Sequence, residues 1–178
     1  MNMGKLFTHF GMLTLGMALT ASIVAADKLS DLQAKFDREN KGVAKAKLLE
    51  KLGDEQILAA RAAGHQGDYS TAGLILEKYR DNGRAAVEAL TKQQADAERH
   101  PNGFRQAEMA LRRGIREVDE MLLVAPDFYR PPLQIVRRDL IDLNDRLLRA
   151  LFPRRAEPTA PPQKPESSGT PPRQEKNP

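Results

Sequence analysis

Residues 130–152 read RPPLQIVRRDLIDLNDRLLRALF and contain the most regular pattern in the chain. Apolar residues recur there at steps of three and four, which places them along one face of a helix. Pro132 stands at the entrance, where a helix does not need the amide proton that proline lacks. Pro153 disfavours helical geometry at Phe152, so we expect the helix to end near that residue. The expected buried stripe consists of Leu133, Val136, Leu140, Leu143, Leu147 and Ala150.

Similar spacing predicts further helices on the N-terminal side of this stretch. Residues 27–40 and residues 43–66 each carry an apolar stripe. Gly53 lies inside the second stretch, which therefore reads either as one helix with a weak point or as two helices, with Asp54 capping the second. The two stripes consist of Leu29, Leu32 and Phe36, and of Ala46, Leu49, Leu52, Ala59 and Ala63.

Two more helices are expected between these stretches and the last helix. Gly67 suits the left-handed position after a helix, and Asp68 is a good N-cap for the next one. Pro101 favours a break before it and a new helix after it. Gly73 and Gly83 should allow a partner helix to approach closely, because they have no side chain. The two stripes consist of Ala72, Leu76, Tyr79, Gly83, Ala86 and Leu90, and of Phe104, Ala107, Leu111, Ile115, Val118, Leu122 and Ala125.

These patterns predict an all-α fold, an antiparallel array or bundle of four to five helices in one domain at residues 27–152. The chain has no cysteine and no tryptophan, and 5% of its residues are aromatic. Aliphatic side chains and alanine must therefore form the core, without disulfides to support it. The regular stripe of the last helix could serve either this core or the seam of a homo-oligomer.

The first 26 residues have the organisation of a secretory signal peptide. Lys5 gives a positive start, an apolar run occupies residues 6–24, and small residues precede Asp27. We therefore expect an exported protein, periplasmic or secreted, whose mature chain begins at Asp27. The alternative is an uncleaved membrane anchor at residues 6–24, because this run is close to the roughly 20 residues that a membrane span needs.

The composition changes after Phe152. Eight of the 12 prolines lie in residues 153–178, together with serines, lysines and glutamates. A segment with so few apolar residues cannot bury a core, so we expect a disordered, proline-rich tail. Two Pro-x-x-Pro spacings, at residues 158–161 and 162–165, match a pattern that aromatic grooves recognise, but a solvated spacer has the same composition.

The charge pattern argues against nucleic acid as a partner. The expected mature chain carries 27 Lys and Arg, one fewer than the 28 of the whole chain, against 24 Asp and Glu, which gives a net charge of +3. The two signs alternate and do not form one basic face. In the last helix, Asp139, Asp142 and Asp145 share a broad face and could hold a divalent cation. Arg146 and Arg149 follow two of them by four residues, so the alternative is a solvated face of ion pairs within the helix.

The connection before the last helix is the main candidate for an interaction surface. Phe128, Tyr129 and Arg130 bring two aromatic rings and a guanidinium group next to two rigid prolines. A partner protein or an envelope component could bind there. The alternative is a hydrophobic staple, in which Phe128 or Tyr129 packs against the first turn of the following helix.

The sequence contains no recognisable catalytic, metal or cofactor motif. His65 and His100 follow the expected signal peptide, and each lies near an expected helix end, where the helix dipole is enough to account for it. An enzyme would need a site assembled from distant residues such as His65, His100, Asp96 and Glu108. We therefore expect neither a cofactor nor catalysis.

One short segment resembles part of a known repeat. Gly67-Asp68-Tyr69, followed by Ala72, resembles the start of the second helix of a tetratricopeptide repeat. Further along, Tyr79 and Arg84 replace the small residue and the proline of that repeat, and no second copy recurs at the repeat period. The overall pattern also resembles small exported helical proteins of uncharacterised function, a resemblance that implies no activity.

Three classes of function follow from these observations. The first is an exported, non-catalytic interaction or scaffold module of the cell envelope. The second is a ligand- or metal-binding helical bundle, which would use the carboxylates of the last helix or a pocket between helices. The third is an enzyme whose site is assembled from distant polar residues.

Overall fold

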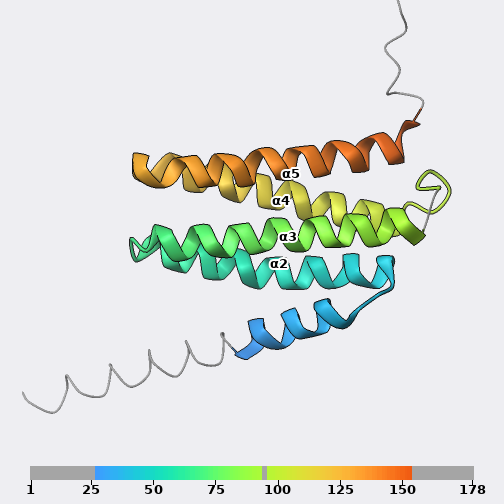
Figure 1. Ribbon diagram of the computed structural model, residues 1–178, viewed down its shortest axis with the longest axis horizontal. Helices are drawn as coiled ribbons and strands as arrows, with labels where there is room; N and C mark the ends of the chain where they lie inside the picture. Colours follow the sequence, from blue (N-terminus) through green and yellow to red (C-terminus); the bar gives the residue numbers. More distant parts are fainter. Residues whose placement is uncertain (1–26, 94–95, 154–178) are drawn as a thin grey trace, which may run out of the picture.

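The computed structural model describes residues 27–93 and 96–153, and all regular structure within them is helical. Consecutive helices lie side by side and run antiparallel (Figure 1). The predicted all-helical array is therefore confirmed, whereas the signal peptide expected at residues 1–26 and the tail expected beyond Pro153 lie outside the described residues. None of the described helices is long and apolar enough to cross a membrane. A helix at residues 27–38 is followed by α2 (Gly42–His65), α3 (Tyr69–Gln93), α4 (Asn102–Val124), the short 3₁₀ helix η1 (Asp127–Tyr129) and α5 (Arg130–Leu151).

Two helical hairpins, α2–α3 and α4–α5, pack against each other. In this packing α2 contacts α4, and α3 contacts α5. The ion pairs Asp54–Arg113 and Arg61–Glu117 advance in the same direction along α2 and α4, so these two helices are parallel. Both helices therefore finish at the same end of the bundle, where the α4–α5 connection also lies (Figure 1).

The last helix buries the stripe that its sequence predicts, with two corrections at its ends. α5 begins at Arg130, two residues before the expected entrance at Pro132, so both Pro131 and Pro132 lie in its first turn, which tolerates proline. At the other end Ala150 is exposed, and Leu151 is buried in its place. The stripe packs into the shared core and consists of Leu133, Val136, Leu140, Leu143, Leu147 and Leu151.

Helix α2 is continuous across Gly53, so the alternative of two helices is wrong. Its stripe also differs from the expected one, because Ala60 is buried and Ala59 is half-buried. In α4 the expected Ile115 and Leu122 are likewise half-buried, and other residues take the core positions beside them. These residues are Ala110, Gly114, Glu117 and Met121.

A polar contact lies inside the core where the helix at residues 27–38 meets α2 and α3. Asn82 is 3% exposed, and its side-chain amide donates to Gln33 at 2.9 Å and to Gln56 at 3.4 Å. Gln33 donates back to Asn82 at 3.1 Å. Buried amides need such partners, so this contact fixes the three helices relative to one another.

Tyr79 of α3 fills the space between α2 and α4. Its side chain is 1% exposed, and burial raises the pKa of its hydroxyl group, which donates a hydrogen bond to the backbone carbonyl of Ala110. The ring lies against Gly53 and Gly114, where added Cβ atoms would collide with it. The close approach expected at Gly83 is also present, since a Cβ there would lie 2.7 Å from Leu111.

The turn between α2 and α3 forms as its sequence predicts. Gly67 has a φ of 77°, and the amides of Gly67 and Asp68 donate to the carbonyls of Gly64 and Ala63, which is the Schellman arrangement. The Asp68 carboxylate then accepts a hydrogen bond from the Thr71 amide at 3.0 Å, and this bond lowers the pKa of Asp68. The turn thus ends one helix and begins the next within two residues.

Candidate functional site

The interaction residues expected from the sequence lie at the end of the bundle where α4 connects to α5. Tyr129 is half-buried and packs against the core, whereas Phe128 is 84% exposed and does not pack as a hydrophobic staple. Its ring meets the half-buried ring of Tyr129 edge-on, with 5.4 Å between centroids, and Tyr129 lies 5.9 Å from Tyr69 of α3. Arg130 turns back, and its Nε donates to the carbonyl of Ala125 at 3.0 Å. The connection is therefore anchored on both sides of Phe128.

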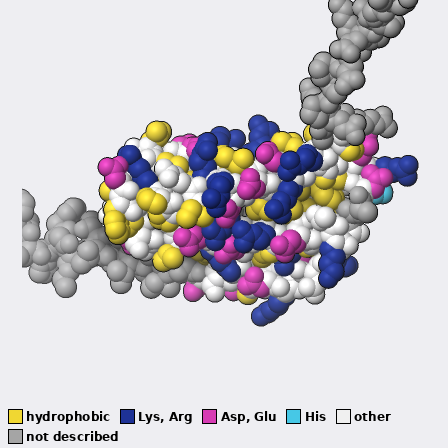
Figure 2. Space-filling model, turned by 45° about the horizontal axis from the view of Figure 1, so that its top comes forward, with side chains coloured by type: hydrophobic (Ala, Val, Ile, Leu, Met, Phe, Trp, Pro, Cys, Tyr) yellow, Lys and Arg dark blue, Asp and Glu magenta, His cyan; other side chains and the backbone are white. Residues whose placement is uncertain are grey.

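Two more apolar side chains are exposed beside Phe128. Leu123 and Val124, the last residues of α4, are 80% and 65% exposed. We call Leu123, Val124 and Phe128 the apolar cap. Figure 2 shows hydrophobic side chains gathered at the end of the molecule on the left, whereas Lys, Arg, Asp and Glu cover its middle. The composition of the connection pointed to Phe128, but nothing in the periodicity distinguished Leu123 and Val124 from ordinary outer positions of a helix.

A cavity of about 470 Å³ lies beside the cap, between the last turns of α2 and α4. Tyr69, Met121 and Val124 contribute apolar surface to it, and the hydroxyl group of Tyr69 donates to the carbonyl of Val124 at 3.3 Å. Gly64 and His65, at the end of α2, also line the cavity. Val124 belongs to both features, so the cap and the cavity form one continuous surface.

The charged side chains in the cavity are coupled to one another. Glu117 is 3% exposed, and its two carboxylate oxygens accept hydrogen bonds from Nε of Arg61 at 2.9 and 2.8 Å. Arg61 also contacts Glu120 at 3.1 Å. The hydrogen bond to Glu117 raises the pKa of the Arg61 guanidinium group. A buried carboxylate is tolerated because the guanidinium group pairs with it through two hydrogen bonds. Two carboxylates share one guanidinium group, so these three side chains together carry a net charge of −1.

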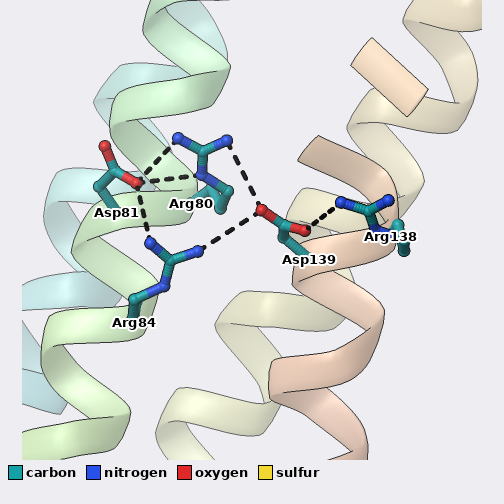
Figure 3. Close-up of polar contacts among 5 residues, drawn as sticks. All are labelled: Arg80, Asp81, Arg84, Arg138 and Asp139. Atoms are coloured by element: carbon teal, nitrogen blue, oxygen red, sulfur yellow. Dashed lines mark hydrogen bonds and ion pairs between the residues drawn. The ribbon is translucent and has the colours of Figure 1, made fainter. Parts of the chain in front are cut away.

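The three carboxylates of α5 that were expected to bind a cation do not form a common site. Asp139 is directed at α3, where it pairs with Arg80 at 3.7 Å and Arg84 at 3.5 Å, and it also contacts Arg138 at 3.2 Å (Figure 3). Asp142 is exposed on the surface of α5, as is Asp145. In the described part of the chain, no group of three or more His, Cys, Asp or Glu side chains could hold a metal ion.

The ion pairs link neighbouring helices more than they pair residues within one helix. The expected pairs of Asp142 with Arg146 and of Asp145 with Arg149 are not among those formed by the described residues. Instead, α4 is joined to its neighbours on both sides, and the helix at residues 27–38 is joined to α2. These pairs are Asp54–Arg113, Arg61–Glu117, Asp119–Arg137 and Lys28–Glu55.

The residues considered for an assembled catalytic site are not brought together. His65 ends α2 at the end of the bundle that carries the cap. His100 and Asp96 lie in the α3–α4 connection at the opposite end (Figure 1), where the Asp96 side chain accepts a hydrogen bond from the Arg99 amide at 2.9 Å. Glu108 pairs with Arg112 on its own helix at 3.3 Å. These four positions do not form one site.

No protein-family model, curated protein or solved structure matches this chain. Tyr69 and Ala72, which carry the tetratricopeptide-like pattern, both lie in the first turn of α3 and contribute to the core.

Proposed function

We propose that the protein is an exported, non-catalytic interaction module of the cell envelope that binds a partner protein through the apolar cap. The observation that carries this proposal is the exposure of three large apolar side chains at one end of the bundle, with Phe128 at 84%. Exposed apolar clusters of this kind mark interaction sites more often than single exposed apolar residues do.

The energetics favour a protein partner for this surface. Burying a large apolar side chain contributes about 1.5–3 kcal/mol, and the cap offers three of them. The surface is also held in place before binding, because Tyr129 packs against Tyr69 and Arg130 bonds to Ala125. A preorganised surface loses less conformational entropy on association than a flexible loop does.

The cellular location is part of the same proposal. The signal-peptide pattern of residues 1–26 supports export, and the absence of cysteine is compatible with an oxidising compartment because no thiol is present to mispair. A non-catalytic role is supported by the separation of His65 from His100 and Asp96 and by the engagement of Asp139 with arginines.

Site-specific photocrosslinking in the source cells tests this function. A photoreactive amino acid is placed at position 128 or 123, and at Arg99 as the control, because Arg99 has an 83% exposed side chain at the opposite end of the bundle. We expect one discrete adduct from positions 128 and 123 in the exported fraction and none from position 99. An adduct of twice the chain mass would identify the partner as a second copy. The same set of adducts from all three positions would contradict the proposal.

A further inference from the structure

We propose that the cavity between α2 and α4 receives a cationic side chain, lysine or arginine, that the partner protein carries next to an apolar residue seated on the cap. This inference rests on the proposed function and specifies the chemistry of the partner. Three features of the cavity support it: its formal charge, the helix ends that line it and its apolar wall.

The formal charge of the cavity favours a cation over an anion. Arg61 is the group that would attract an anion, but Glu117 and Glu120 already occupy its guanidinium group. The net charge of −1 is left uncompensated within the cavity. Glu120 is the accessible member of the set, because its side chain is 63% exposed whereas Glu117 is buried. An incoming ammonium or guanidinium group could therefore pair with Glu120 while Arg61 keeps Glu117.

The two helix ends add to this charge. Because α2 and α4 are parallel, both C-termini lie at the same end of the bundle, and the residues Gly64, His65 and Val124 bring them to the cavity. Each helix C-terminus is equivalent to about half a negative elementary charge. The last turn of α4 contains no basic residue that would offset it, whereas the last turn of α2 contains His65. The partial negative charge of the helix ends thus favours a cation at the same place as the Glu120 carboxylate does.

The apolar wall suits a cation on an alkyl stem. Tyr69, Met121 and Val124 provide surface for methylene groups, and an aromatic ring can also attract a cation. The cavity volume of about 470 Å³ lies within the range of roughly 300–1,000 Å³ that is usual for ligand pockets. Since Val124 is shared with the cap, the residue next to the cation in the partner would lie over Leu123 and Phe128.

A titration followed by nuclear magnetic resonance tests the cavity without the partner. The protein, expressed from its full sequence, is titrated with hexylammonium, with neutral hexanol and with hexanoate, while the Met121 methyl and Gly64 amide signals are observed. We expect saturable shifts with hexylammonium, binding of hexanol at least about tenfold weaker, and none of hexanoate. Glu120→Lys should weaken hexylammonium binding by about tenfold or more. Glu98→Lys changes the net charge equally at an exposed position in the α3–α4 connection, and it should leave binding unchanged.

Three results would overturn the inference. They are equal binding of hexanol and hexylammonium, equal weakening by Glu98→Lys and Glu120→Lys, and no saturable shift at Met121 up to the solubility limit of hexylammonium. The outcome is separable from that of the crosslinking experiment. A position-specific crosslink at Phe128 together with a failed titration would reject the cationic side chain alone. A successful titration without any crosslink would reject the proposed function.

Discussion

Substitution of Gly114 by alanine should destabilise the protein, although alanine is the better helix former. The exchange favours the helical state of α4 by about 1 kcal/mol. The new Cβ would, however, lie within 3.0 Å of three ring atoms of Tyr79. Overpacking costs about 1–3 kcal/mol, and here the ring cannot move away, because Gly53 lies against it and its hydroxyl group is bonded to Ala110. We expect the free energy of unfolding to fall by about 2 kcal/mol at most after the helix gain is included.

Gly73→Ala is the matched control for this prediction. Gly73 is also inside a helix, but a Cβ there would meet nothing within 4 Å, so the helix gain of about 1 kcal/mol should appear alone. This residue therefore does not provide the close helix approach that its sequence suggested. Urea unfolding followed by circular dichroism measures both variants. A second Tyr79→Leu substitution should recover part of the loss in Gly114→Ala, because the two positions are in contact. Unfolding free energies that rise in both glycine variants would refute the proposed packing of Tyr79.

Three further substitutions test other parts of the structure. Arg61→Met should lower the free energy of unfolding by about 3 kcal/mol, since it leaves Glu117 buried without its cation; a loss below about 0.5 kcal/mol in urea unfolding would contradict the pairing. Leu140→Ala should cost about 2–5 kcal/mol through loss of a fully buried side chain, as measured by thermal unfolding, and an unchanged melting temperature would contradict its burial. The lowered pKa of Asp68 means that its cap stabilises the protein above the unfolded pKa of about 3.9 and loses this effect as the pH falls through the native pKa. Asp68→Asn keeps a capping side chain but should be less sensitive to acid between about pH 5 and pH 2, and a melting curve with the same pH dependence as the natural protein would exclude this role.

Much of the fold could be predicted from the sequence, because helical periodicity is a local signal. The stripe of α5 and the Gly67-Asp68 turn depend on neighbours within a few residues, and both were predicted correctly apart from the last position of the stripe. The core positions of Gln56 and Glu117 could not be recognised, because a polar side chain is buried only when its partner on another helix is present. The sequence of α2 contains no indication that Arg61 will meet α4.

The candidate site also has one part that the sequence predicts and one part that it does not. Phe128 stood out by composition, since two aromatic residues close to two prolines are unusual in a chain with few aromatics. The cavity depends on the parallel packing of α2 and α4, which brings Glu120 close to residues far away in sequence. The spacing of residues within a single helix cannot predict that arrangement, because it depends on the packing between two helices.

The apolar cap is tested most directly by combining one crosslink with one substitution. A photoreactive residue at position 123 is compared in the natural chain and in a Phe128→Ser variant. Because Phe128 is 84% exposed, the substitution should change the free energy of unfolding by no more than about 0.5 kcal/mol. We predict a discrete adduct at position 123 that is lost in Phe128→Ser at unchanged stability. An adduct of equal yield in both chains would contradict the cap as the binding surface.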